Sequence, residues 1–282
     1  MMGRERITIL IVIYNESVEI MLRTLEQIKN FKIIIVDNSQ NFNLKKIILN
    51  KYKIYKYHIA KKNLGYSRGY NLAFSFCNTE YIFIKNADCF ISEENIMKLY
   101  HYINNDINCG IVSPVSYDKH GKLSYNAGKL IENVKEKVPL EVQGDVCVES
   151  VLGASIFTKS KYFKEAGMFD EDLFIYFSDY DLCKKIYQSR KQIIQLYESK
   201  SIHVHGISKV NNLFKKTFLR EYYYLLDNLI YLYKNNKTDD VIKKKNKYFV
   251  KAIINFFILR WIKSLKFYSK YLAIKKFEQF SL

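Results

Sequence analysis

The stretch FDEDLFIYFSDYDLC, residues 169–183, gathers acids in a chain whose formal net charge is +17. Asp179 and Asp181 stand at the start of a predicted helix, where the helix dipole stabilises an anion. Two residues apart, they do not share a helix face, so we expect them to have different roles. One could cap the helix. The other, beside the apolar FIYF, would have a raised pKa and could act as a general base.

Two further carboxylates follow buried strands. Asp88, in the run Asn86-Ala87-Asp88, could bind a divalent cation that holds phosphates. The alternative is that it caps a helix or fixes a turn. Asn86 could orient Asp88 without itself binding the metal. Asp37 could accept hydrogen bonds from a ribose hydroxyl or a base, and its alternative is again a turn-stabilising role.

The loop NLGYSRGYN, residues 63–71, contains Gly65 and Gly69, which permit close approach of the backbone to a ligand. Arg68 could pair with a phosphate, although the loop has neither the Walker nor the GxGxxG spacing. Of His203 and His205, one that faces the same crevice could bind a metal or phosphate. A buried histidine without a ligand is the alternative.

Predicted strands and helices alternate along the first half of the chain, and they would position these residues. Buried strands are predicted at 7–15, 32–39 and 80–90, with helices between them. This alternation predicts an α/β fold with a mostly parallel sheet flanked by helices. Ligands bind such sheets at the carboxyl ends of the strands, so the polar residues after each strand should meet at one crevice.

Composition narrows the class of protein. Of the 282 residues, 49% are hydrophobic, which is enough to form a core. The number of cysteines, five, is odd, and no two of them have CxxC spacing. We therefore expect reduced thiols rather than disulfides or a zinc site. MMGRER passes directly into the short run ITILIVIY, so no signal peptide is predicted. The sequence also lacks a run of about 18 uncharged apolar residues, so no spanning helix is expected.

The C-terminal segment differs from the rest. Residues 209–282 hold 17 Lys and Arg against 5 Asp and Glu, an excess of 17 − 5 = +12, together with 17 aromatic residues. We expect a separate helical module here. A basic, aromatic, amphipathic helix suits the surface of an anionic membrane. A helical cap on the first domain with a solvated lysine face is the alternative.

Six segments occur together in a specific order and spacing: VIYNE (12–16), IIVDNS (34–39), NLGYSRGYN (63–71), IKNADCF (84–90), VLGASIFTKSKYFKEAGMFDEDLF (151–174) and YFSDYDLCKK (176–185). In combination they resemble the family-two inverting glycosyltransferases of GT-A fold. They are most similar to the rhamnosyltransferase-like branch that builds bacterial O-antigen and capsule. The resemblance covers about 7–208. It implies a GT-A catalytic domain at 1–208, with a donor half to about 110 and an acceptor half from 111, followed by a helical extension at 209–282.

The resemblance implies roles on the donor side. Asp37 would contact the nucleoside, the loop after Val12 would close over the base, and Asp88 would hold Mg²⁺ or Mn²⁺ on the diphosphate, with His205 approaching the metal. The other implied donor contacts are Tyr14, Asn15, Glu16, Asn63, Gly65, Arg68 and Asn86.

On the acceptor side, the resemblance implies that Asp179 deprotonates a hydroxyl, which attacks the anomeric carbon as the nucleoside diphosphate leaves. Ser178 stands where the family often has Glu. Asp170, Glu171 and Asp181 would bind the acceptor.

The implied donor is dTDP-rhamnose, a UDP-hexose or UDP-galactofuranose. The acceptor would be a glycan on a polyprenyl diphosphate lipid. The expected location is cytoplasmic, peripheral to the inner face of the plasma membrane.

Two other functions are alternatives. A sequence pI near 9.4 with interleaved aromatics permits nucleic-acid binding. No helix-turn-helix, RRM or zinc-finger pattern occurs, however, and the charge is concentrated in one tail, so no nucleic-acid partner is expected. Sugar nucleotidyl transfer would need a glycine-rich loop after the first strand, and YNESVEI contains no glycine.

Overall fold

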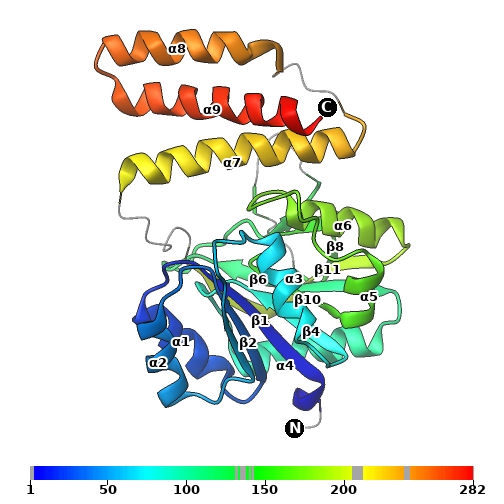
Figure 1. Cartoon of the computed structure of the whole chain (residues 1–282). Coiled ribbons are helices and arrows are strands. Elements are labelled where there is room, and N and C mark those ends of the chain that lie inside the picture. Colours follow the sequence, from blue (N-terminus) through cyan, green and yellow to red (C-terminus); the bar gives the residue numbers. More distant parts are fainter. Residues whose placement is uncertain are drawn as a thin grey trace. The chain divides into compact units, whose positions relative to one another are not determined.

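Figure 1 shows a computed structural model of the chain, which describes residues 3–130, 133, 138–139, 141, 143–204, 212–237 and 242–281. The chain forms two compact units: unit 1 is Met1–Asp170 with Ser178–Lys209, and unit 2 is Glu171–Phe177 with Val210–Leu282. The short segment Glu171–Phe177, which sequence analysis placed within the catalytic part, thus packs with the C-terminal helices. His205 lies outside the described residues.

Unit 1 is built on a nine-stranded sheet in the order β3-β2-β1-β4-β10-β6-β11-β5, with β8 also paired to β11. Its strands are β1 (Ile7–Ile13), β2 (Lys32–Asp37), β3 (Lys56–Ile59), β4 (Tyr81–Lys85), β5 (Cys89–Phe90), β6 (Cys109–Tyr117), β8 (Val146–Cys147), β10 (Ser155–Lys159) and β11 (Gln192–His203). Its α-helices are α1 (Val18–Ile28), α2 (Phe42–Lys51), α3 (Ser67–Ser75), α4 (Glu93–Asn105), α5 (Ser160–Glu165) and α6 (Ser178–Gln188). A small second sheet pairs β7 (Ala127–Gly128) with β9 (Ser150–Val151).

The predicted α/β fold is confirmed, and its strand directions divide along the chain. Strands β1 to β4 are parallel wherever they pair, as the alternation predicted. In the second half, β10 runs antiparallel between β4 and β6, while β11 is parallel to β6 and antiparallel to β5. The sheet is therefore mixed, and its parallel part, β1 to β4, is the part that the local pattern could predict.

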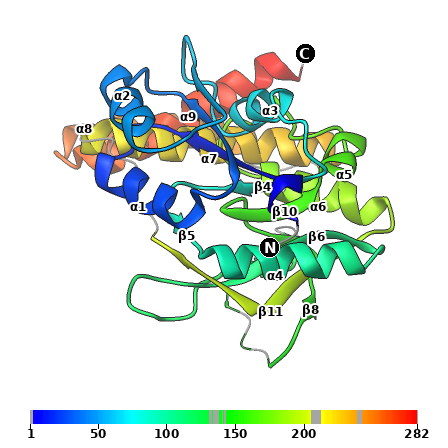
Figure 2. The ribbon, with the colours of Figure 1, turned by 90° about the horizontal axis from the view of Figure 1, so that it is seen from below.

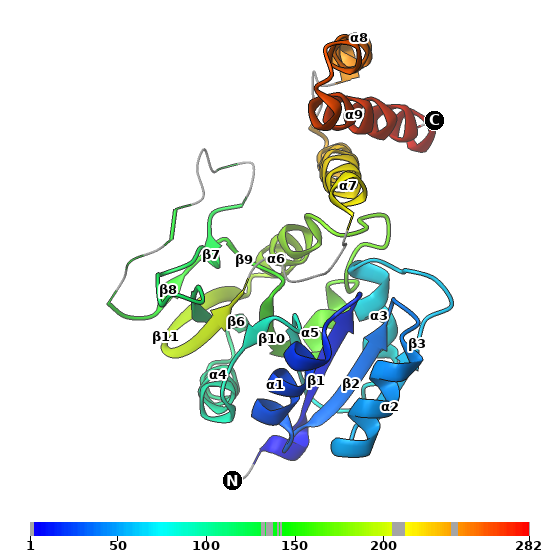
Figure 3. The same cartoon turned by 90° about the vertical axis from the view of Figure 1, so that its left-hand side faces the viewer.

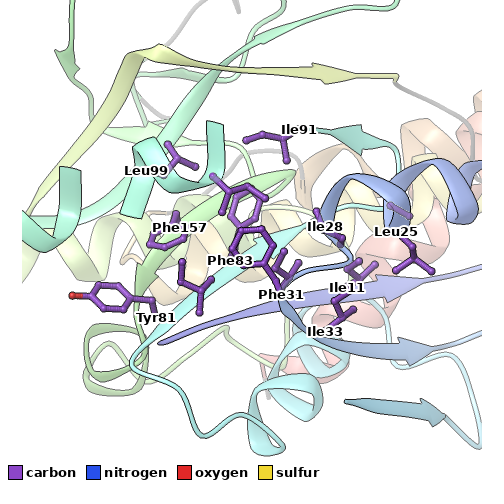
Figure 4. Packing of buried hydrophobic residues seen from close by; sticks show 14 of the residues in the cluster. Ile11, Leu25, Ile28, Phe31, Ile33, Tyr81, Phe83, Ile91, Leu99 and Phe157 are labelled. Atoms are coloured by element: carbon purple, nitrogen blue, oxygen red, sulfur yellow. The ribbon is translucent and has the colours of Figure 1, made fainter. Parts of the chain in front are cut away.

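Helices cover both faces of the sheet, which explains why its strands are apolar on both sides. Ile11 of β1 packs with Leu25 of α1 and Phe83 of β4 in one core, drawn in Figure 4. Leu10 points to the other face and packs in the core that contains Tyr70 of α3. Helices α1, α2 and α4 supply the first core, and α3, α5 and α6 the second. Figures 2 and 3 show α4 alongside β11, and Figure 3 shows α6 on the opposite face.

Unit 2 is the predicted C-terminal helical extension. It contains α7 (Leu213–Lys234), α8 (Lys245–Phe257) and α9 (Trp261–Phe280), with α9 packed between the other two (Figures 1 and 3). Among the described residues, none of the helices has the length and hydropathy needed to cross a bilayer.

Asp227 of α7 holds the segment Glu171–Phe177 within unit 2. One oxygen of its fully buried carboxylate accepts hydrogen bonds from the backbone N–H of Ile175 at 2.8 Å and of Tyr176 at 2.9 Å. Phe174 stacks on Tyr223 with ring centroids 4.2 Å apart. Burial raises the pKa of Asp227 to about 6, against the lowering effect of these backbone donors.

The raised pKa of Asp227 predicts a pH-dependent stability. Because the folded protein binds this proton more tightly than the unfolded chain, the stability contribution is present below about pH 4 and is lost as pH rises through about 6. The loss is on the order of 3 kcal/mol. Denaturant unfolding of the wild type and of Asp227→Asn across this range measures it. The wild-type free energy of unfolding, relative to that of the variant, should fall with pH. A constant difference would contradict the prediction.

Candidate active site

Helix α3 packs closely on β1 and organises the site. A Cβ added at Gly69 would lie 2.8 Å from Cγ1 of Val12, so only glycine permits this separation. The predicted glycine loop 63–71 thus serves helix packing, in addition to any contact with a ligand.

Two tyrosines of this segment reach the strand ends. The Tyr66 hydroxyl donates to the carbonyl of Gly153 at 2.7 Å, and the Tyr70 hydroxyl donates to the carbonyl of Lys85 at 2.9 Å. Their ring centroids are 4.6 Å apart. The loop before β10 and the end of β4 are therefore both fixed to α3.

The same helix also holds the acidic stretch. Asn71 forms two hydrogen bonds with the backbone of Phe169, at 2.9 and 3.1 Å. The hydroxyl groups of Ser67 and Ser178 lie 2.7 Å apart at the start of α6. Ser178, which replaces the Glu common in the resembling family, thus connects α6 to α3.

Asp179 lies in the first turn of α6 and is half-buried. Its Oδ2 accepts a hydrogen bond from the backbone N–H of Gly153 at 2.9 Å, and its Oδ1 accepts one from that of Tyr180 at 3.0 Å. The two hydrogen bonds therefore hold the carboxylate of Asp179 in one orientation.

The other predicted acceptor residues are placed differently. Asp181 is buried and forms an ion pair with Lys185, one helical turn later, at 2.6 Å. Asp170 is half-buried and belongs to unit 1, whereas Glu171 is exposed and belongs to unit 2. Their roles toward an acceptor stay predictions.

Asp88 lies between β4 and β5, beside the end of β11. The antiparallel pairing of β5 with β11 sets His203 opposite Cys89 and brings His203 Nε2 to 3.4 Å from Asp88 Oδ1. His203 is buried. His205, the histidine predicted near the metal, lies outside the described residues, so its role stays a prediction. The pairing of β11 with β5 places the other candidate, His203, beside Asp88.

Glu16, in the loop after β1, faces the same carboxylate. Burial, followed by the negative charge of Asp88, raises the pKa of Glu16 to about 7. Its Oε2 is buried and has no hydrogen-bond partner among the described residues. Lys85 is buried too; its ammonium donates to the carbonyl of Asn86 at 3.0 Å, and burial lowers its pKa to about 8. The predicted residues Glu16, Asn86 and Asp88 thus lie in one poorly solvated region that contains several ionisable side chains.

Asp37 is fully buried at the end of β2. Its carboxylate accepts hydrogen bonds from the backbone N–H of Ser39 at 2.7 Å and from the Tyr57 hydroxyl at 3.1 Å. Contacts of this kind stabilise a turn, which was the alternative role expected for Asp37. Its contact with a nucleoside stays a prediction. Beyond β1, Tyr14 is half-buried, and Asn15 is exposed with a φ of 57°.

Asn38 is a site residue that the sequence analysis missed. Its buried side chain donates to the carbonyl of Gly65 at 3.0 Å and accepts from the N–H of Leu64 at 3.3 Å. Asn63 in turn accepts from the N–H of Gly65 at 2.9 Å, while Arg68 is exposed. The end of β2 therefore shapes the loop in which three of the predicted donor contacts lie.

Comparison with known proteins gives a consistent picture. Residues 8–160, more than half of the chain, match the family described as Glycosyl transferase family 2. The dTDP-rhamnosyl transferase RfbF of Shigella flexneri is 25% identical over 238 residues, which cover 80% of this chain and 79% of that protein.

Solved glycosyltransferase structures share the fold. GalNAc-T7 with UDP, GalNAc and Mn²⁺ superposes with a TM-score of 0.60 at 15% identity, over 79% of this chain and 50% of that one. The mannosyltransferase PcManGT from Pyrobaculum calidifontis, in complex with GDP-Man and Mn²⁺, gives 0.56 at 14% identity over 81% and 65%. TarS 1-349 of S. aureus gives 0.56 at 13% identity over 97% and 91%. The chain spans half the length of the first structure.

The two bonds of Asn38 predict a specific loss of stability. Asn38→Ala leaves the buried carbonyl of Gly65 and the half-buried N–H of Leu64 without this partner, so the free energy of unfolding should fall by about 1–3 kcal/mol. Gln40→Ala is the matched control, because the exposed Gln40 amide donates to the carbonyl of Lys61 in the same loop. Denaturant unfolding should show a change within about 0.5 kcal/mol for the control. Equal losses in both variants would refute the importance of burial at Asn38.

Proposed function

The chain belongs to glycosyl transferase family 2, and from this premise we propose that it transfers a sugar, with inversion, from a nucleoside diphosphate to a hydroxyl group of a growing bacterial surface glycan. The RfbF relative supports dTDP-rhamnose as the donor. A UDP-hexose or UDP-galactofuranose is the alternative. The family membership favours glycosyl transfer over sugar nucleotidyl transfer.

The orientation of Asp179 is the observation that carries the mechanism. At the start of α6, the carboxylate of Asp179 is oriented by a hydrogen bond from the N–H of Gly153, and a general base must be positioned in this way. In a single displacement, the acceptor hydroxyl proton passes to Asp179. The hydroxyl oxygen bonds to the anomeric carbon, and the bond from that carbon to the diphosphate oxygen breaks. Asp170, Glu171 and Asp181 are proposed to orient the acceptor.

The group around Asp88 fits a divalent cation. Among the described residues, no group of three or more His, Cys, Asp or Glu side chains could hold a metal ion by itself. Mg²⁺, however, is commonly bound by one or two carboxylates together with substrate phosphates. The carboxylate of Asp88, with the His203 ring 3.4 Å away, would supply an oxygen ligand suited to Mg²⁺ or Mn²⁺, and the donor phosphates would supply others. When bound, such a cation neutralises charge on the departing diphosphate.

The remaining donor contacts follow the resemblance. Asp37 and the residues after β1 (Tyr14, Asn15) are proposed to lie near the nucleoside, and Asn63, Gly65 and Arg68 along the diphosphate and sugar, with His205 near the metal. The acceptor is proposed to be carried on a polyprenyl diphosphate lipid. The basic C-terminal helices support a position at the inner face of the plasma membrane.

Substitution of Asp179 tests the proposed base. Asp179→Asn keeps an oxygen that can accept from Gly153 and removes the basicity, so transfer should fall by about 10²–10⁴-fold while donor binding persists. Sugar-nucleotide hydrolysis and transfer assays, with thermal shift for donor binding, measure both quantities. Asp172, which belongs to the same acidic stretch and forms an ion pair with Lys234, provides the control: Asp172→Asn should stay active. Transfer at the wild-type rate by Asp179→Asn would exclude it as the base.

A second test addresses the cation. The rise in Tm caused by a nucleoside diphosphate should be larger with Mn²⁺ than without it, because ligands that bind the native state stabilise it. Asp88→Asn should remove this metal-dependent increment, and His203→Ala should reduce it. Glu94→Gln, an exposed change on α4, should leave it intact. A metal-dependent increment that survives Asp88→Asn would place the cation elsewhere.

A further inference from the structure

The turn between α8 and α9 presents a continuous apolar surface. Every residue from Phe256 to Lys263, with the sequence FFILRWIK, is exposed. Phe257 is 77% exposed and Leu259 is 70% exposed. Contiguous apolar patches of this kind are rare on soluble monomers and mark interaction sites.

The backbone of this turn is also unusual. Arg260 N–H donates to the carbonyl of Asn255 at 2.8 Å, and Leu259 N–H donates to that of Phe256 at 3.1 Å, which is the hydrogen-bond pattern of a Schellman motif. The residue at the position of Leu259 has a φ of 58°, where glycine is preferred. A leucine at this position destabilises the folded protein in water, because its backbone is in the left-handed region and its apolar side chain is exposed. A binding partner that covers the side chain accounts for this leucine better than the stability of the fold does.

An apolar pocket of about 400 Å³ adjoins the turn. Phe256 and Trp261 meet edge to face there, with ring centroids 4.9 Å apart. The walls also include Phe249, Leu265 and Tyr268. The tip of the α8–α9 hairpin thus combines protruding apolar side chains with a concave apolar surface.

The positive charge of α8 and α9 indicates what kind of partner binds the turn. Residues 241–277 contain no Asp or Glu, and their cations are Lys243, Lys244, Lys245, Lys247, Lys251, Arg260, Lys263, Lys266, Lys270, Lys275 and Lys276. Two copies of this surface would repel one another, whereas an anionic bilayer offers both hydrocarbon and negative charge. Aromatic residues beside Lys and Arg are typical of the membrane–water interface.

We propose that the α8–α9 turn inserts into the surface of an anionic lipid bilayer. Phe257, Leu259 and Trp261 enter the boundary between headgroups and acyl chains, and Arg260 and Lys263 bind lipid phosphates. The helices lie on the membrane and do not cross it. The inference deepens the proposed function and rests on it for the lipid-linked acceptor; the bilayer contact itself is tested separately.

The chain contains a single tryptophan, Trp261, so its fluorescence reports this turn alone. In the full-length protein, vesicles of phosphatidylcholine with phosphatidylglycerol should shift the emission to shorter wavelength, and brominated acyl chains should quench it. Phosphatidylcholine vesicles should have a smaller effect. An unchanged spectrum with the anionic vesicles would overturn the proposal.

The double variant Phe257→Ser, Leu259→Gly separates anchoring from folding. Its affinity for anionic vesicles in a flotation assay should fall by at least about tenfold. Its Tm should stay the same or rise, because glycine adopts the left-handed conformation without strain. Ile107→Ser removes an equally exposed side chain from unit 1 (72% exposed) and should bind vesicles like the wild type.

The same proteins distinguish the remaining outcomes. Transfer to a water-soluble acceptor should be the same in the double variant as in the wild type. If the wild type binds vesicles but transfers no sugar, the proposed function is refuted and the membrane anchor stands. If it transfers sugar but does not bind vesicles, the anchor is refuted and the proposed function stands. If light scattering without lipid shows a dimer that the double variant loses, and vesicle affinity is unchanged, the turn binds a second copy and the anchor is refuted.

Discussion

The close packing of Gly69 on Val12 is the constraint on which the candidate site depends. It brings α3 near enough to β1 for Tyr66 and Tyr70, one turn apart, to reach the backbone on either side. Gly153, which accepts from Tyr66, donates to Asp179, and Lys85, which accepts from Tyr70, precedes Asp88 by three residues. Both carboxylates therefore take their positions from one helix. A displacement reaction needs its groups placed to within about 0.5 Å, and a shared rigid reference is a direct way to achieve this.

The neighbourhood of Asp88 buries several ionisable groups and is electrostatically unfavourable. Glu16 holds its proton more tightly than usual, and Lys85 holds its proton less tightly, because burial penalises both charged forms. Folding alone would favour apolar residues at these positions. Perturbed groups of this kind cluster at functional sites, where a ligand supplies the missing partner. In the proposed function, that ligand is a cation together with a diphosphate.

The sequence predicted what depends on local periodicity and could not predict what depends on distant pairing. The apolar runs gave β1, β2 and β4 and the polar residues after them, and the acidic stretch gave Asp179 at the start of α6. The importance of Asn38 arises from contacts with a loop 27 residues away, and that of Asp227 from a backbone segment 52 residues away. The position of His203 beside Asp88 depends on the pairing of β11 with β5. Neither propensity nor spacing encodes such partners.

The segment Glu171–Phe177 joins the two functions assigned to this chain. By packing, it belongs to the helices that carry the proposed membrane anchor, because Asp227 binds its backbone. By covalent continuity, it leads through Phe177, whose φ is 67°, directly into Ser178 and Asp179. A backbone held in this uncommon conformation persists only when its surroundings determine it. The segment is therefore packed in the unit proposed to meet the lipid and is covalently continuous with the helix that bears the proposed base.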